Sequence, residues 1–284
     1  MKHHIWKQVI IIGVLVVMLG ICPTHAYVSD DLDFEPVDGG TSGPSGKTFT
    51  NSIGMKFVLI PKGTFMMGSP SSEPKRDSDE RQHRVTLTKG FYLGTTEVTQ
   101  GQWRNIMGKA SSCFPSENRP VENISWNDAQ KFIQNLNKRE NTDKYRLPTE
   151  SEWEYACRAG TTKPFYTGMC IFTDQANYKG NYPMPGCSKG RYRKTTTEVE
   201  SFSPNKWGLH DMHGNVYEWC DDWYQDDYPS EHIADPKGPT SGSGRVVRGG
   251  SWNFIMRHVR SAARGRADPD GRSYDLGFRL VLVN

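Results

Sequence analysis

After Gly160 the sequence shows no long run of helical or strand-like hydrophobic periodicity, and short strands are predicted only near residues 199–202, 245–248 and 278–283. Aromatic side chains are nevertheless abundant, since the chain has 8 Trp, 12 Tyr and 12 Phe. A chain with few long elements and many aromatic rings must build its core from side-chain packing between short elements and loops. We therefore predict an irregular, loop-rich α+β domain.

Regular elements are predicted mainly before Gly160. Residues 57–60 and 63–68 are apolar runs separated by Pro-Lys-Gly, which predicts a short hairpin, and further strands are predicted at 84–87 and 91–93. One helix is predicted to begin at Ser125, because the apolar residues that follow recur on one helical face. A second helix is predicted to begin at Thr149, where Glu152 completes a capping box, and to end at Gly160.

The N-terminus has the pattern of an export signal. Lys2 and Lys7 precede an apolar run from 9 to 21, and small residues lead to Ala26, which predicts a signal peptide over 1–26. Cys22 lies in a loose lipobox, so lipidation at that residue is the alternative to cleavage after Ala26. Residues 27–48 are acidic and then rich in Gly, Ser and Pro, which predicts a flexible tether before a domain over 49–284. We expect an exported protein at the cell surface or outer membrane that contacts the membrane only through a lipid anchor.

Charge and cysteine content limit the partners and cofactors. The formal net charge of +3 is too small to predict nucleic-acid or membrane binding by itself. Cys170 and Cys187 bracket a loop that a disulfide could close in an exported protein. Cys157 and Cys220 stand beside aromatic residues and are expected to be buried. No CxxC or His/Cys spacing predicts a zinc site.

The turn at 208–219 contains oxygen ligands of the kind that calcium prefers. Asp211 and Glu218 flank a glycine turn, and two carboxylates with interleaved backbone carbonyls are typical calcium ligands. The alternative is that both carboxylates cap backbone amides or face solvent. His210 and His213 lie three residues apart in a loop, and we expect them to be structural or exposed rather than metal ligands.

Several segments form an ordered set of motifs: residues 51–68, 97–99, 120–129, 146–156, 208–219 and Arg248-Gly-Gly-Ser-Trp252. Together they resemble the formylglycine-generating enzyme (sulfatase-modifying factor) family, and the resemblance implies the C-type-lectin-like fold of that family. It also implies a calcium site at four positions, of which the middle two bind through backbone carbonyls: Asp211, Gly214, Val216 and Glu218. A second family calcium site is matched only in its first half, by Asn177 and Tyr178.

The same resemblance argues against the oxidase chemistry of the family. Oxidase members carry a copper-binding cysteine pair shortly after the Gly-Gly-Ser motif. Residues 252–263 of this chain contain no cysteine, and the thioether of Met256 cannot form a thiolate. We therefore expect no catalytic residues and no catalytic cofactor, with calcium as the one structural ion. The alternative hypothesis is an oxidase or protein-modifying enzyme with a non-standard site, built from Cys220, His210, His213 and Asp211.

The segment 253–278 has a restricted composition. It contains arginine at 257, 260, 264, 266 and 272 but no Lys, Glu, Gln or Trp. Most of its other residues can be encoded by AAC codons whose adenines have changed. This pattern resembles the variable region of proteins diversified by diversity-generating retroelements, of the Treponema variable protein type. The resemblance implies a monomeric, non-catalytic surface receptor or adhesin that binds a protein or glycan, and no nucleic acid, through this segment.

Aromatic and aliphatic anchors beside arginine are typical of the centre of an interface. The residues expected to contact the ligand are Trp252, Phe254, Ile255, Arg257, His258, Ala263, Gly265, Ala267, Asp268, Gly271, Ser273, Tyr274 and Asp275. The alternative is a solvated loop in which Arg264, Arg266 and Arg272 hold the fold together through bidentate hydrogen bonds.

Overall fold

The computed structural model describes residues 47–228 and 231–283. The predicted signal peptide, the Cys22 lipobox and almost all of the predicted tether lie outside the described residues. The first strand is β1 (Thr48–Thr50), so the folded domain already includes the last residue that the sequence assigned to the tether. No helix in the described part of the chain is long and apolar enough to cross a membrane.

The largest sheet brings the two ends of the domain together. Its order is β1, β2 (Lys56–Ile60), β5 (Phe91–Gly94), β12 (Val281–Leu282) and β6 (Tyr145–Arg146), and every neighbouring pair is antiparallel. The C-terminal strand β12 therefore lies between β5 and β6 and joins the N-terminal strands to the region that carries the helices.

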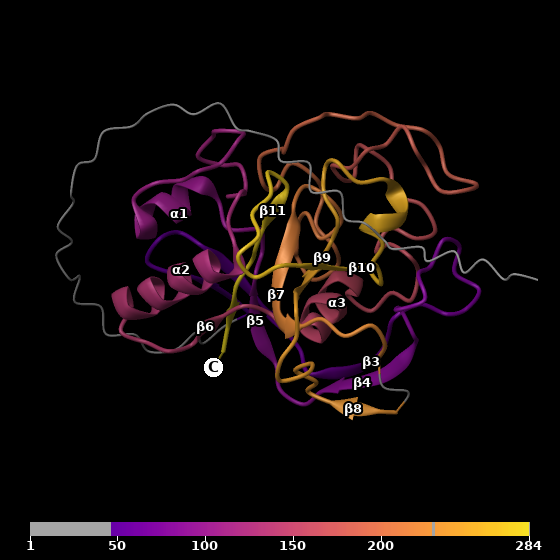
Figure 1. Cartoon of the computed structure of the whole chain (residues 1–284), viewed down its shortest axis with the longest axis horizontal. Coiled ribbons are helices and arrows are strands. Elements are labelled where there is room, and N and C mark those ends of the chain that lie inside the picture. The colour runs from indigo at the N-terminus through magenta and orange to yellow at the C-terminus, as the bar shows by residue number, and fades with distance from the viewer. Residues whose placement is uncertain (1–46, 229–230, 284) are drawn as a thin grey trace, which may run out of the picture.

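A second sheet contains the strands that surround the Gly-Gly-Ser motif. β10 (Arg264–Ala267), β9 (Arg245–Arg248) and β7 (Tyr217–Trp223) are antiparallel, and β11 (Leu276–Gly277) runs parallel to β7. In Figure 1 this sheet lies near the middle of the molecule, between the helices α1 and α2 on one side and α3 on the other.

A third, three-stranded sheet corrects the predicted hairpin. It contains β3 (Gly63–Met67), β4 (His83–Leu87) and β8 (Ile233–Ala234). β3 pairs with β4, whereas β2 pairs with β1 and β5, so the hairpin predicted over 57–68 is wrong. Gly63 turns the chain toward the third sheet at a crowded point, where an added Cβ would lie 2.2 Å from the hydroxyl of Tyr155.

Three α-helices each begin with a capping box. α2 (Trp126–Arg139) and α3 (Glu150–Arg158) begin where the sequence predicts them. α1 (Gln100–Met107) was not predicted, although Thr99 and Gln102 form its capping box, because only two of its residues are buried and it shows little apolar periodicity. α1 packs against α2, and α3 contacts β3, β7 and β9.

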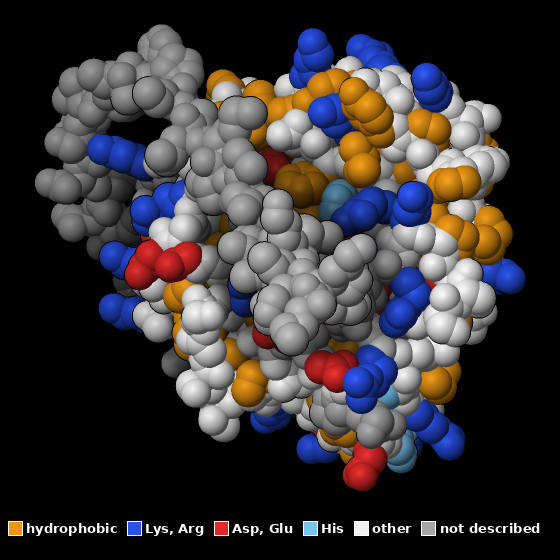
Figure 2. Space-filling model, turned by 45° about the vertical axis from the view of Figure 1, so that its right-hand side comes forward, with side chains coloured by type: hydrophobic (Ala, Val, Ile, Leu, Met, Phe, Trp, Pro, Cys, Tyr) orange, Lys and Arg blue, Asp and Glu red, His pale blue; other side chains and the backbone are white. Residues whose placement is uncertain are grey.

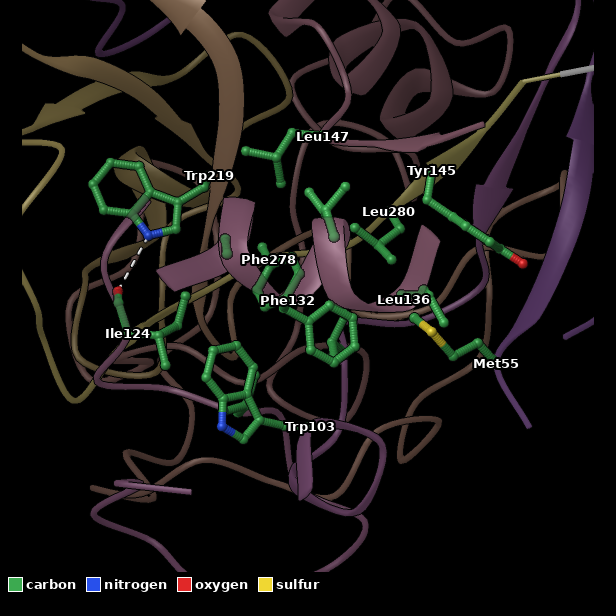
Figure 3. Packing of buried hydrophobic residues seen from close by; sticks show 14 of the residues in the cluster. Met55, Trp103, Ile124, Phe132, Leu136, Tyr145, Leu147, Trp219, Phe278 and Leu280 are labelled. Atoms are coloured by element: carbon green, nitrogen blue, oxygen red, sulfur yellow. Dashed lines mark hydrogen bonds between the residues drawn. The ribbon is translucent and has the colours of Figure 1, made fainter. Parts of the chain in front are cut away.

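The main core lies between α1, α2 and the two larger sheets. Trp103 of α1 stacks on Phe132 of α2 with ring centroids 5.4 Å apart, and Phe278 meets both rings edge-on (Figure 3). Trp219 of β7 joins the same cluster and donates through Nε1 to the carbonyl oxygen of Ile124 at 3.2 Å. The aromatic residues thus connect short elements that are distant in the sequence, as the composition predicts.

The second half of the domain is mostly irregular, as predicted. Residues 161–216 contain turns and isolated bridges but neither a helix nor a longer strand. The strand predicted at 199–202 is wrong, because Glu200 has a φ of +62° and the chain turns there. The sequence did not reveal β7, because Glu218 and Asp222 occupy buried positions where a strand pattern would show apolar residues.

Candidate ligand-binding site

The segment 253–278 is fixed to the second sheet at two places. After the Gly-Gly-Ser motif it forms the short 3-10 helix η1 (Met256–Val259), returns as β10 beside β9, and ends in β11 beside β7. It is drawn in yellow in the upper part of Figure 1. Its backbone is therefore part of the fold, and the question is which of its side chains point inward.

Arg260 anchors the segment to residues 73–80. Its guanidinium is fully buried, and Nη1 donates to Glu73 at 2.6 Å and to Glu80 at 2.8 Å. It also donates to the carbonyl oxygens of Arg257 and Lys75. Burial by itself would raise the pKa of Glu80, but the charge and hydrogen bonds of Arg260 hold that pKa below its usual value. Arg260 is thus a structural residue.

Arg248 and Arg264 form a second buried network with α3. Arg248 pairs with Glu154, and Arg264 donates to the two carboxylate oxygens of Glu150 at 2.7 and 3.0 Å. The guanidinium of Arg264 also lies over the ring of Tyr228, 3.9 Å from its centroid. The fold therefore encloses four arginines of this region, none of which was among the residues expected to contact the ligand: Arg248, Arg260, Arg264 and Arg279.

The remaining arginines lie at the surface. Arg272 makes a bidentate pair with Asp128 at 2.8 and 2.9 Å. Arg257 lies 3.4 Å from Asp77, and Arg266 keeps 59% of its side chain exposed. Of the three arginines proposed as alternative structural residues, Arg264 is enclosed and Arg272 is paired, whereas Arg266 faces solvent.

Phe254, Ile255, Arg257 and His258 lie together at the start of η1. All four are half-buried, and the Phe254 ring meets Tyr217 at 4.9 Å and His258 at 5.5 Å. Burial, followed by the charge of Arg257, lowers the pKa of His258 to about 4, so its imidazole is neutral at physiological pH. The group offers apolar surface and hydrogen-bonding atoms but no acid–base pair.

Trp252 is the centre of an aromatic cluster beside this group. Its ring lies 5.5 Å from Tyr274, 6.1 Å from Tyr192 in a stacked arrangement, and 5.4 Å from Phe114. Asn253 joins the two tyrosines, because its Oδ1 accepts from the Tyr192 hydroxyl at 2.6 Å and its Nδ2 donates to the Tyr274 hydroxyl at 3.1 Å. Trp252 itself is buried, and its Nε1 has no hydrogen-bond partner among the described residues.

Besides the buried Trp252, three of the predicted contact residues are enclosed by the fold. Ala263 is buried, and Asp275 is buried while accepting hydrogen bonds from two serine hydroxyls. Gly265 lies against Val247, where an added Cβ would be 2.9 Å from Cγ2. We therefore correct these three positions to structural ones. The other predicted positions in this stretch are half-buried or exposed: Ala267, Asp268, Gly271, Ser273 and Tyr274.

A neighbouring loop contributes residues that the sequence interpretation missed. The disulfide between Cys170 and Cys187 is present, as the spacing predicted. The loop that it closes is attached to the segment, because Lys179 donates its backbone N–H to the carbonyl oxygen of Phe254 at 2.8 Å. Residues 175–197 contain no Asp or Glu, and that charge pattern could have identified the loop beforehand.

The predicted calcium carboxylates lie in a buried acidic cluster. Asp211, Glu218 and Glu97 surround Arg279, and both Asp211 Oδ1 and Glu97 Oε2 lack a hydrogen-bond partner among the described residues. Burial, followed by the charges of Asp211 and Glu218, raises the pKa of Glu97 well above its usual value. Glu218 is already engaged, because its two oxygens accept from Arg279 at 2.6 and 2.7 Å and one of them also accepts from Trp153. The excess of negative charge fits a cation, but Glu218 is not free to bind one in this arrangement.

Gly214 and Val216 complete the predicted calcium set. Gly214 has a φ of +91°, and an added Cβ would lie 2.3 Å from the carbonyl oxygen of Asn177, so only glycine fits. The half-matched family site at Asn177 is therefore adjacent to the calcium site predicted in the 211–218 turn. Within the described residues no three His, Cys, Asp or Glu side chains are placed to hold a metal ion. A cation in this turn would need backbone carbonyl oxygens as well as Asp211.

The groups named in the enzyme hypothesis do not form a nucleophilic site. Burial raises the thiol pKa of Cys220 well above its usual value. Cys157 lies 3.8 Å from Nδ1 of His213, but burial raises the pKa of the thiol to about 12 and lowers that of the imidazole to about 3. Nδ1 of His210 donates to the carbonyl oxygen of Phe202 at 2.8 Å. A neutral thiol beside a neutral imidazole lacks the ion pair that activates cysteine.

Comparison with known protein families gives a match that spans the folded domain. Residues 45–283 match the sulfatase-modifying factor enzyme 1-like domain. The chain belongs to the sulfatase-modifying factor family. This family member is 30% identical over 304 residues to the formylglycine-generating enzyme of Mus musculus, covering 86% of this chain and 78% of the mouse protein.

Solved structures extend the comparison beyond the enzymes. Treponema denticola variable protein 1 superposes with a TM-score of 0.72 and 29% identity, covering 85% of this chain and 100% of that one. PvdO from Pseudomonas aeruginosa gives a TM-score of 0.72 and 29% identity, covering 86% and 100%. The sulfatase-modifying factor domain therefore has the C-type-lectin-like α+β fold that the motifs predict. Since its relatives include both enzymes and a variable protein, family membership alone does not decide between catalysis and binding.

Proposed function

We propose that this member of the sulfatase-modifying factor family is a non-catalytic receptor or adhesin, displayed at the cell surface, that binds a protein or glycan through segment 253–278. The observation that carries the proposal is the division of the segment into two sets of side chains. Buried arginines hold its backbone, whereas Phe254, Ile255, His258 and Tyr274 are half-buried on the outer side. A fixed backbone with aromatic and aliphatic anchors is suited to recognition.

The chemistry of the segment supports binding over catalysis. It has no cysteine in residues 252–263, where the oxidases of the family are expected to carry their copper ligands. The free cysteines of the described chain, Cys157 and Cys220, are buried with raised pKa values. Similarity to a variable protein supports the interpretation that the outward positions change between related sequences. The predicted export signal supports display outside the cell.

We also propose that a calcium ion stabilises the 211–218 turn and does not contact the bound ligand. The support is the buried cluster of Asp211 and Glu97, whose unpartnered carboxylate oxygens would be better stabilised by a cation than by each other. Because Glu218 is held by Arg279, Asp211 and Glu97 are the carboxylates that fit the ion best.

Replacing the outer residues tests the proposed function. A graft that exchanges residues 254, 255, 258 and 274 for those of another variable segment, and keeps every buried arginine, should lower the melting temperature by no more than about 8 °C, since four substitutions at about 0.5 kcal/mol each cost at most about 2 kcal/mol and each kcal/mol corresponds to about 2–4 °C. It should change which ligand binds.

A coding near-repeat of this stretch that differs only at adenines would support diversification. Stoichiometric copper together with oxygen consumption on a thiol peptide would refute the receptor interpretation.

A further inference from the structure

The loop beside segment 253–278 has an excess of basic residues, although Asp174 and Glu198 adjoin its basic stretch and the charge of Asp174 acts on Arg193. Between residues 175 and 197 there is no acidic residue, and there are five basic ones: Lys179, Lys189, Arg191, Arg193 and Lys194. None of these five forms an ion pair with an acidic side chain within the described residues. Nη1 of Arg193 is buried without a hydrogen-bond partner in the same part of the chain, while its Nη2 donates to the carbonyl oxygen of Thr173 at 2.6 Å. This surface thus presents cations, whereas the unpartnered Nη1 of Arg193 is buried.

Exposed large apolar side chains occur in the same stretch of the chain as these cations. The exposed fractions of Met169, Phe172 and Tyr182 are 52%, 44% and 55%, whereas most large apolar residues of the domain are buried. The ammonium of Lys179 lies 5.2 Å from the ring centroid of Tyr182 and 5.4 Å from that of Tyr192. In Figure 2, hydrophobic and basic side chains dominate the upper right of the face, and acidic side chains are sparse there.

This basic aromatic face (Met169, Phe172, Lys179, Tyr182, Arg191 and Tyr192) is continuous with the segment. The backbone of Lys179 is hydrogen-bonded to Phe254, and Tyr192 both stacks on Trp252 and donates to Asn253. The Cys170–Cys187 disulfide closes the loop that carries three residues of this face, Phe172, Lys179 and Tyr182, and Met169 directly precedes that loop. A ligand that rests on Phe254 and Tyr274 would therefore extend onto the basic aromatic face.

We infer that the ligand is an acidic polypeptide whose carboxylates meet Lys179 and Arg191 and whose apolar side chains meet Phe172 and Tyr182; this inference rests on the proposed binding function. Complementary charge favours an anionic partner. Exposed Met, Phe and Tyr beside Arg are the composition of a protein interface. A polyanionic glycan would match the charge but would leave Met169 and Phe172 without apolar partners.

Synthetic polymers provide a defined probe. Binding of the full domain to a random copolymer of glutamate and tyrosine is compared with poly-glutamate, a lysine–tyrosine copolymer and heparin, by biolayer interferometry at two salt concentrations. We expect the glutamate–tyrosine copolymer to bind more tightly than each of the others and to weaken as salt rises. Lys179→Glu and Tyr182→Ala should each weaken its binding by at least about five-fold, which corresponds to loss of a contact worth about 1 kcal/mol.

Matched variants separate the possible results. Lys62→Glu is an equivalent charge reversal at an exposed residue just before β3, a strand that lies in the lower part of Figure 1, and it should leave binding unchanged. Unchanged melting temperatures show that each variant is folded. If Tyr274→Ala abolishes binding while Lys179→Glu and Tyr182→Ala do not, the basic aromatic face plays no part and the proposed function stands. If heparin binds as tightly as the copolymer, the acidic-polypeptide inference is overturned. If Tyr274→Ala, Lys179→Glu and Tyr182→Ala all leave binding unchanged, both the proposed function and the acidic-polypeptide inference fail.

Discussion

Replacing Arg260 tests whether arginines of segment 253–278 hold the fold. Arg260→Met keeps a side chain of similar length but removes the charge and every hydrogen bond that the guanidinium makes to Glu73, Glu80 and two backbone carbonyls. Glu73 and Glu80 are themselves buried, with exposed fractions of 7% and 0%. The variant therefore leaves two enclosed carboxylates without the cation that neutralises them.

The expected loss of stability is large. Removing one partner of a buried ion pair typically costs about 3–5 kcal/mol, because the remaining charge stays desolvated. In a domain of this size each kcal/mol lowers the melting temperature by about 2–4 °C, so we expect a decrease of about 6–20 °C at pH 7. The control is Arg266→Met, in which the side chain is 59% exposed and its nearest carboxylate, Asp226, is 4.0 Å away. The control should change stability by less than about 0.5 kcal/mol.

The pH dependence gives an independent check of the cause. In the wild-type protein the pKa of Glu80 lies below its usual value, so this carboxylate adds stability above its unfolded pKa of about 4.3, and that stability is lost as the pH falls through the folded pKa. In Arg260→Met, Glu80 keeps its hydrogen bonds from Ser69 and Asp77 but loses the cation that neutralises it, so its pKa rises and the variant gains stability as the pH falls. The difference in the free energy of unfolding between the wild-type protein and Arg260→Met should therefore be smaller at pH 4 than at pH 7.

Urea unfolding followed by tryptophan fluorescence measures these differences. Adding Glu73→Gln and Glu80→Gln to Arg260→Met should recover part of the loss, because the double replacement removes the unpaired charges. If Arg260→Met unfolds at the same urea concentration as Arg266→Met, the buried ion pairs do not hold the segment and the division of its side chains into anchors and outer residues is refuted.

Three further predictions concern the metal turn and the cysteines. Burial raises the pKa of Asp211 to about 7, so in the metal-free domain the contribution of this carboxyl group to stability should fall by up to about 4 kcal/mol as the pH rises from 4 to 7. Calcium should restore this loss in the wild-type protein but not in Asp211→Asn, and a flat calorimetric titration with the wild type would argue against the site. Cys157 and Cys220 should react with a thiol reagent at pH 8 only after unfolding, so labelling of the native protein would contradict their burial. Reduction of Cys170–Cys187 should weaken binding to the glutamate–tyrosine copolymer while the rest of the domain stays folded, and equal binding before and after reduction would show that the loop need not be closed.

Local signals in the sequence predicted the elements that depend on local chemistry. Ser125 and Thr149 cap helices where the capping pattern places them, because a side-chain oxygen and a nearby acid satisfy the first backbone amides. The hairpin failed for a non-local reason. Residues 57–60 pair with β5, which supplies a full-length antiparallel partner, so the short turn at 61–63 leads the chain into another sheet.

For the candidate site, the sequence predicted which segment to consider but not which of its side chains are enclosed by the fold. The composition of 253–278 identified the segment, yet Arg260 and Arg257 look alike in the sequence. Arg260 is enclosed because it donates hydrogen bonds to Glu80, which lies 180 residues away in the sequence. A local sequence pattern cannot predict that contact. The basic loop was missed for a similar reason, since Lys179 joins Phe254 only through tertiary structure.

The enclosed residues also determine how far segment 253–278 can vary. Gly265 has no room for a Cβ against Val247, and Ala263 and Asp275 are buried. Substitution at these positions would require the four-stranded sheet to shift, and a shift there would disturb the ion pair between Arg264 and Glu150. Variation without unfolding is therefore restricted to the outer positions. Those positions adjoin a basic loop that lies outside the segment and would stay the same when the segment varies. The ligands of different variants would therefore all be negatively charged and would differ in their apolar contacts.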